Sequence, residues 1–179
     1  MTIRPMRDSA SDLAVMARWL SDPRVLEFYE GRDRPHDVEM VRDGFLRRTE
    51  VKGETPCIVE VHGRPIGYIQ FYPIDADEAA EYGLDPGEAV YGIDQFIGEP
   101  ALWDQGLGRA MVRLMLSYLL GERGAARVVL DPAVDNERAI RCYQACGFRR
   151  VKLLPEHELH EGRRRDCWLM AVTRETAVY

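Results

Sequence analysis

The chain has 179 residues, a length that fits one domain with a sizeable buried core. Its formal net charge of −6 argues against nucleic-acid binding, which needs clustered Lys and Arg, and is compatible with a cationic small substrate. No stretch approaches the ~18 consecutive apolar residues of a membrane span. Charged residues among the first dozen positions leave no apolar core for a signal peptide, so we expect none.

The chain has four cysteines, and none of them forms a Cys-x-x-Cys pair. Cys142 and Cys146 are one helical turn apart, near other apolar residues. We therefore expect reduced, mostly buried thiols in a cytoplasmic protein, with a disulfide or a zinc site as the less favoured alternative.

The N-terminal half predicts both helices and strands. Apolar residues repeat at helical spacing through Asp12–Leu20, which predicts an amphipathic helix capped by Ser11. The other elements predicted here are a strand at Thr2–Met6, a helix at Val38–Arg47, and strands at Pro56–Val61 and Pro65–Tyr72 joined by His62-Gly63-Arg64.

The C-terminal half alternates strands with helices. Pro73–Glu88 is predicted as a loop that is rich in acidic residues and has no Lys or Arg. A polar loop is also predicted between the last two strands. The predicted elements are strands at Val90–Ile97, Arg127–Leu130, Phe148–Leu153 and Cys167–Val172, and helices at Gln105–Leu120 and Asn136–Cys146. This order predicts an α/β or α+β fold with a central mixed sheet that contains a parallel pair joined by a crossover.

Two segments that contain glycine carry most of the functional information. In Trp103–Gly108, the sequence Gly106-Leu107-Gly108 opens a helix, whose free backbone N–H groups and positive dipole end can hold a phosphate. The second segment, Asn136–Phe148, predicts a helix that begins at an Asn cap and ends before Gly147. Together they predict an enzyme that binds a cofactor containing a pyrophosphate.

The order of elements resembles the GNAT acetyltransferase superfamily over almost the whole chain, including the string Asn-x-x-Ala-x-x-x-Tyr-x-x-x-Gly-Phe from Asn136 to Phe148. The resemblance implies a single GNAT-type domain over residues 1–179. It also implies a mixed sheet of about six to seven strands, about four flanking helices and a splayed strand pair that admits acetyl-CoA. The backbone amides of five residues would bind the pyrophosphate: Gln105, Gly106, Leu107, Gly108 and Arg109. Trp103 stands where the family prefers Gln or Arg.

Two residues of the second segment have both structural and functional interpretations. Tyr143 is either a core aromatic or the acid that protonates the departing CoA thiolate, whose basicity is similar to that of a phenol. Asn136 caps its helix, and the family implies that it also bonds the pantetheine arm. No metal is expected, because the spacing of His157 and His160 does not match His-Glu-x-x-His.

Longer strings resemble aminoglycoside 6'-N-acetyltransferases, including the acetyltransferase half of bifunctional acetyltransferase–phosphotransferase resistance enzymes. They are Trp19–Asp33, Val90–Pro100, Leu130-Asp131-Pro132, Leu154–Gly162 and Asp166-Cys167. This resemblance implies transfer of the acetyl group of acetyl-CoA to the 6'-amine of an aminoglycoside, in a ternary complex and with resistance as the result. Its partners would be the polycationic drug and acetyl-CoA, with no nucleic acid or membrane.

The resemblance assigns the acceptor site to carboxylates and aromatic residues. Asp94 would orient the 6'-ammonium and take its proton, directly or through water. The backbone of Phe96 and Ile97 would bind the pantetheine arm and polarise the thioester carbonyl. The expected substrate-binding residues are Phe28, Tyr29, Tyr91, Asp94, Gln95, Asp131 and Asp166.

Two alternatives stay open from the sequence. The acceptor could be another amine, such as a polyamine, a siderophore lysine or a protein amine. The chain could also be a non-catalytic protein that binds acyl-CoA or an antibiotic, although the presence of Asp94 and Tyr143 argues against that. The acidic segment Asp75–Glu88 is either a solvated loop or a lid that attracts ammonium groups.

Overall fold

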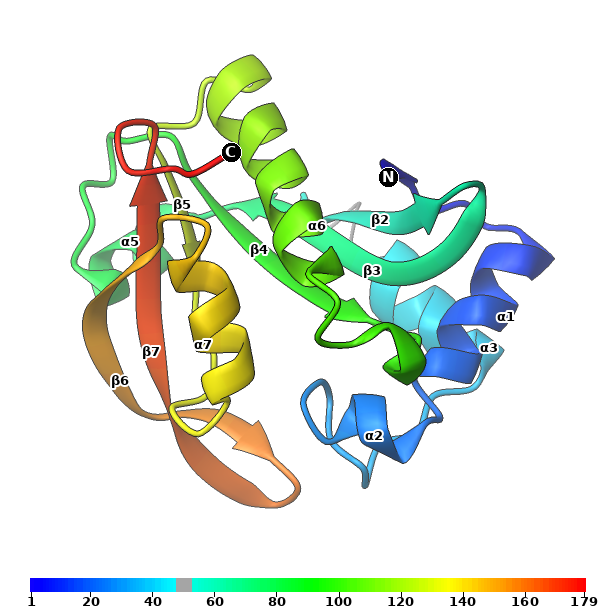
Figure 1. Ribbon diagram of the computed structural model, residues 1–179. Helices are drawn as coiled ribbons and strands as arrows, with labels where there is room; N and C mark the ends of the chain where they lie inside the picture. Colours follow the sequence, from blue (N-terminus) through cyan, green and yellow to red (C-terminus); the bar gives the residue numbers. More distant parts are fainter. Residues whose placement is uncertain (48–52) are drawn as a thin grey trace. The chain divides into compact units, whose positions relative to one another are not determined.

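The computed structural model describes residues 1–47 and 53–179 (Figure 1). Within these residues, a seven-stranded sheet has the strand order β1-β2-β3-β4-β5-β7-β6. The strands are β1 Thr2–Pro5, β2 Thr55–Val61, β3 Arg64–Pro73, β4 Val90–Ile97, β5 Arg127–Leu130, β6 Arg149–His160 and β7 Arg163–Thr173. β4 and β5 are parallel, whereas β1–β2, β2–β3, β5–β7 and β6–β7 are antiparallel, so the predicted mixed sheet with a parallel pair is confirmed.

The helical segments differ in length and in type. The α-helices are α1 Ala10–Trp19, α2 Pro23–Leu26, α3 Val38–Val41, α5 Ala76–Tyr82, α6 Leu107–Leu116 and α7 Glu137–Gln144. Wider π-helical turns extend α3 over Arg42–Leu46 and α6 over Ser117–Glu122, and a 3-10 turn occupies Pro100–Leu102. No described helix is long and apolar enough to cross a membrane.

The chain divides into two compact units. The first unit comprises Met1–Phe71 and Asp94–Met111, and the second comprises Tyr72–Ile93 and Val112–Tyr179. The core of the first unit gathers Met16, Trp19 and Leu20 from α1 around Ile58 and Tyr68.

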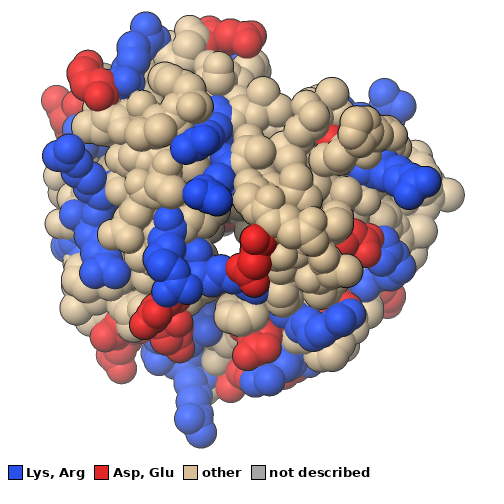
Figure 2. All heavy atoms as spheres, viewed as in Figure 1, with Lys and Arg blue, Asp and Glu red and all other residues tan. Residues whose placement is uncertain are grey.

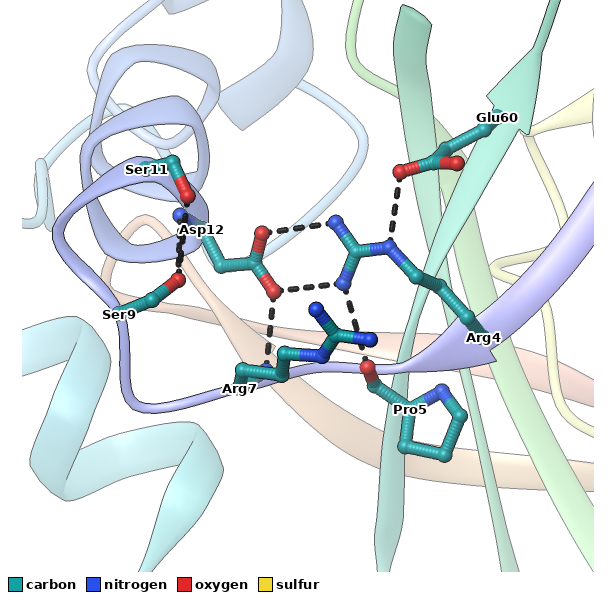
Figure 3. Close-up of polar contacts among 7 residues, drawn as sticks. All are labelled: Arg4, Pro5, Arg7, Ser9, Ser11, Asp12 and Glu60. Carbon is teal, nitrogen blue, oxygen red and sulfur yellow. Dashed lines mark hydrogen bonds and ion pairs between the residues drawn. The ribbon is translucent and has the colours of Figure 1, made fainter. Parts of the chain in front are cut away.

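An ion-pair cluster ties the start of α1 to β1 and β2 (Figure 3). Arg4 Nη1 and Nη2 donate to the two carboxylate oxygens of Asp12 at 2.7 and 2.8 Å, and Arg4 Nε donates to Glu60 at 2.8 Å. The backbone N–H of Arg7 donates to Asp12 as well, at 2.9 Å. These bonds satisfy a carboxylate whose side chain is only 3% exposed.

The cap of α1 differs from the prediction. Ser9, rather than Ser11, accepts a hydrogen bond from the backbone N–H of Asp12, and the helix begins at Ala10. Both serines precede the same apolar stripe, so the apolar pattern did not distinguish them.

The second unit corrects two predicted loops. Part of the segment predicted as the acidic loop Pro73–Glu88 forms α5, which Asp75 caps and Gly83 ends with a left-handed φ of 72°. The segment predicted as a polar loop before the last strand is the hairpin of β6 and β7. Tyr82, Leu154 and Leu169 pack in the core of this unit.

Basic side chains are abundant on the face that carries α7 and β6 (Figure 2). These two elements contribute Arg138, Arg141, Arg149, Arg150 and Lys152. The net charge of −6 therefore hides a local excess of positive charge, which can attract anions.

Candidate active site

In the first unit, Asp94 lies on β4 and is held by a residue of β3. Gln70 Nε2 donates a hydrogen bond of 2.8 Å to Asp94 Oδ2, and the Tyr68 hydroxyl donates one of 2.7 Å to Gln70 Oε1. Side chains two positions apart on a strand share a face, which is why Tyr68 and Gln70 can form this series of bonds. Gln70 and Tyr68 are buried, and Asp94 is half-buried.

Aromatic rings pack against the Tyr68 end of this group. The ring of Phe96 lies 4.8 Å from that of Tyr29 and 5.5 Å from that of Tyr68, measured between centroids. Burial raises the pKa of Tyr29 well above its ordinary value, so its phenol stays protonated. The charge of Asp94 contributes to this rise, so the Tyr29 phenol lies within electrostatic reach of the carboxylate.

The glycine turn before α6 has the backbone geometry that the sequence predicts. Asp104 and Gly106 have left-handed φ angles of 59° and 80°, and α6 begins at the next residue, Leu107. The first-turn N–H groups of a helix have no intrahelical acceptor. Arg109 folds back over this turn, with Nη2 3.6 Å from where a Cβ on Gly106 would stand. Amides and a guanidinium together suit a pyrophosphate.

Trp103 replaces the polar residue that the superfamily prefers before the turn. Its indole N–H donates a hydrogen bond of 2.8 Å to the carbonyl of Ile97, and its ring lies edge-on to Phe28 at 6.2 Å. Phe28 itself is 39% exposed. The indole is directed to the end of β4 and to a residue that we expect at the acceptor site, so its N–H is not directed to the turn.

In the second unit, α7 carries Asn136 and Tyr143. Asn136 Oδ1 accepts a hydrogen bond of 3.2 Å from the backbone N–H of Ala139, which is the predicted cap. Tyr143 is half-buried, and its ring lies 6.0 Å from that of Phe148. The Tyr143 ring thus packs near Phe148, while part of the residue remains exposed to solvent.

Asp131 follows β5 and is paired with a histidine. His157 Nε2 lies 2.9 Å from Asp131 Oδ2, and His157 Nδ1 lies 3.7 Å from Glu81 of α5. The bond to Asp131 raises the pKa of His157. Burial and the charge of Asp131 raise the pKa of Tyr82. The segment predicted as an acidic loop therefore contributes groups around a predicted substrate-binding carboxylate.

The remaining candidates have different surroundings. Asp166 lies within β7, and its Oδ1 accepts a hydrogen bond of 2.9 Å from the backbone N–H of Glu156. The Tyr91 hydroxyl accepts one of 3.4 Å from Arg123 Nη2. Gln95 is half-buried next to Asp94 on β4, so the two side chains point to opposite faces of the strand.

Burial keeps two of the thiols protonated. It raises the pKa of both Cys57 and Cys167 to about 12, which makes them poor nucleophiles. Over residues 1–47 and 53–179, no group of three or more His, Cys, Asp or Glu side chains could hold a metal ion.

Each unit brings together part of the predicted set. The first unit holds Asp94, Gln95, Phe96, Ile97, Phe28, Tyr29 and the turn residues Gln105, Gly106, Leu107, Gly108 and Arg109, and the second holds Tyr91, Asp131, Asn136, Tyr143 and Asp166. Sequence reasoning missed Gln70 and His157, the hydrogen-bond partners of Asp94 and Asp131. The sequence signal for Gln70 was its position two residues after Tyr68 in the predicted strand Pro65–Tyr72, which places both side chains on one face.

Comparison with known proteins places these residues in a family. The family model described as "Acetyltransferase (GNAT) domain" matches residues 8–155. Aminoglycoside N(6')-acetyltransferase type 1 of Klebsiella pneumoniae is 33% identical over 153 residues, which cover 84% of this chain and 74% of that protein.

Solved structures agree with this match. The aminoglycoside acetyltransferase AAC(6')-Ib in complex with coenzyme A has a TM-score of 0.78 at 30% identity, over 98% of this chain and 95% of that chain. The same protein has been solved with coenzyme A and kanamycin, with a TM-score of 0.77, 30% identity and the same coverage. The chain therefore belongs to the GNAT acetyltransferase family.

Proposed function

We propose that this chain transfers the acetyl group of acetyl-CoA to the 6'-amine of an aminoglycoside antibiotic and thereby confers resistance. The observation that carries the proposal is Asp94, which Gln70 holds on β4 in the unit that also contains the Gly106 turn. The 33% identity to an aminoglycoside N(6')-acetyltransferase and the structural likeness to an enzyme solved with coenzyme A and kanamycin support this acceptor.

The residues have separate roles in the proposed reaction. Asp94 orients the 6'-ammonium and accepts its proton, directly or through water. The neutral amine attacks the thioester carbonyl carbon, and the carbon–sulfur bond breaks as the amide forms. Tyr143 gives its proton to the departing CoA thiolate, and the proton that the attacking nitrogen loses as the amide forms returns to Tyr143 through solvent. The product amide is uncharged, so the drug loses one of the positive charges that favour binding to RNA.

Acetyl-CoA fits the residues that we assign to it. The first-turn amides of α6 and the Arg109 guanidinium hold the pyrophosphate, while Asn136 and the backbone of Phe96 and Ile97 hold the pantetheine arm. The position of Arg109 over Gly106 supports this assignment, because a cation beside free amides suits a diphosphate.

The acceptor-binding residues are also part of the proposal. Asp131 and Asp166 attract ammonium groups, Phe28 and Tyr29 pack against a sugar ring, and Tyr91 and Gln95 line the site. We further propose that residues 1–179 act as one catalytic domain in the cytoplasm, where acetyl-CoA is available and thiols stay reduced.

A panel of amines tests the proposed acceptor. Release of CoA should occur with kanamycin, tobramycin and gentamicin, which all carry amines on a sugar ring. Spermidine and free lysine serve as comparison acceptors. Turnover on spermidine alone would contradict the aminoglycoside acceptor while leaving the acetyltransferase family unaffected.

A further inference from the structure

We propose that Tyr68 and Gln70 form a buried hydrogen-bond relay that fixes the orientation of the Asp94 carboxylate and keeps it ionised. Gln70 is the positioning residue, and Tyr68 acts through it. This inference deepens the proposed function and rests on it for the role of Asp94 as the base. The hydrogen bonds on which it depends do not rest on the identity of the acceptor.

The relay has one favourable orientation when Asp94 carries its charge. Gln70 Nε2 donates to Asp94 Oδ2 at 2.8 Å, and Tyr68 donates to Gln70 Oε1 at 2.7 Å. If the amide were turned over, Oε1 would face the carboxylate and two acceptors would oppose each other. The Tyr68 proton would also lose its acceptor in a buried position. Tyr68 therefore fixes the amide with its donor toward Asp94.

Burial makes the loss of either hydrogen bond energetically costly. Tyr68 has no exposed surface and Gln70 is 7% exposed, so water cannot replace either partner. A hydrogen bond donated to a carboxylate favours the ionised form over the protonated form. The relay should thus lower the pKa of Asp94 and prevent the carboxylate from rotating away from the amine.

The phenol of Tyr29 supplies no competing negative charge. Its pKa is raised by burial first, and then by Tyr68, Asp94, Glu30 and Glu54, so it stays neutral. Tyr68 approaches from β3 and Tyr29 from the segment after α2. Because Tyr29 stays neutral, loss of the Gln70 donor should change mainly the pKa of Asp94.

The test is a double-mutant cycle with Gln70→Leu and Tyr68→Phe. The pKa of the Asp94 carboxyl group is measured directly by NMR titration, and the pH profile of kcat/KM is measured on kanamycin. Gln70→Leu should raise the Asp94 pKa by about one to two units. The reason is that losing a hydrogen bond to a charged group destabilises the ionised form by an energy equivalent to a shift of roughly that size. Gln70→Leu should lower kcat about tenfold at neutral pH, because the carboxylate, still ionised there, can rotate away from the amine.

Tyr68→Phe should shift the pKa of Asp94 in the same direction but less, since it frees the amide without removing it. In the Gln70→Leu background, Tyr68→Phe should add no further shift, because Tyr68 acts only through the amide. Ile69→Val, on the opposite face of β3, is the matched control: it removes one buried methylene group but should leave the Asp94 pKa unchanged.

Two results would overturn the relay. One is an unchanged Asp94 pKa in folded Gln70→Leu protein; the other is an additive shift in the double variant. If Gln70→Leu does not fold, Tyr68→Phe decides alone, because it keeps the buried ring and removes one hydroxyl. The NMR titration needs no acceptor, so failure of the relay is distinguishable from failure of the aminoglycoside assignment.

Discussion

Asp94 is one of 30 acidic residues in the chain, and its surroundings separate it from the rest. It lies half-buried on β4 among Tyr29, Tyr68 and Phe96, and a buried amide holds it. The sequence identified Asp94 through its neighbours in Val90–Pro100. It did not identify Gln70, because a strand pattern gives the face of a side chain and not its partner on the next strand.

Replacing Asp94 by Asn removes the proposed proton acceptor but preserves the shape of the side chain. We expect kcat on kanamycin to fall about 100-fold or more, the usual contribution of a general base. The affinity for CoA, measured by calorimetry, should not change, because the amides of α6 and Arg109 are intact. Asp8→Asn, on a side chain that is 62% exposed, is the control. Near-normal turnover by Asp94→Asn would remove this residue from the mechanism.

Tyr143 is tested by removing only its hydroxyl. Tyr143→Phe keeps the ring that packs near Phe148. We expect kcat to fall about tenfold, which is below the usual contribution of a general acid because a thiolate is a good leaving group. The KM for kanamycin should not change. Tyr118→Phe changes another half-buried tyrosine of the same unit and should have no effect. An unchanged kcat for Tyr143→Phe would show that the Tyr143 hydroxyl has no catalytic role and that the ring only packs in the structure.

At the scale of elements, the ends of α1 and β1 are joined through one buried carboxylate. Asp12 accepts two hydrogen bonds from Arg4 and one from the backbone of Arg7, and the Arg4 guanidinium lowers its pKa. Removing one partner of such a pair leaves the other charge without compensation.

We therefore expect Asp12→Ala to lower the free energy of unfolding by about 3 kcal/mol. Chemical denaturation monitored by circular dichroism measures this change. Asp8→Ala breaks an exposed pair with Arg42 and should cost less than about 1 kcal/mol. Equal losses from the two variants would show that burial does not distinguish the pairs.

Two elements that the sequence missed, α5 and the hairpin of β6 and β7, lie in the second unit. The signals for α5 were present, namely Asp75 at its start and Gly83 at its end, but the acidic residues between them obscured a short apolar face. β6 and β7 form one hairpin, yet register shifts at Arg150/Lys152 and Leu154/Glu158 break the alternation of β6. Those two errors explain why the group around Asp131 was missed: its partner His157 comes from β6, and Glu81, which pairs with His157, comes from α5.

At the scale of the whole molecule, the sequence predicted the fold class and the parallel pair β4–β5. It did not predict the strand order, in which β7 lies between β5 and β6. Strand order depends on pairing between distant segments, whereas helix caps, glycine turns and strand periodicity are local. The glycine turn before α6 was therefore predicted closely, and the hydrogen-bond partners of Asp94 and Asp131 were not.

The most direct test of the central claim is the structure of the product made from kanamycin and acetyl-CoA labelled with carbon-13 in the carbonyl group. Two-dimensional NMR of that product locates the new amide. We predict one labelled acetyl group, attached to the 6'-nitrogen, with one equivalent of free CoA. An acetyl group on another amine or on a hydroxyl, or the absence of any acetylated kanamycin, would contradict the proposed function.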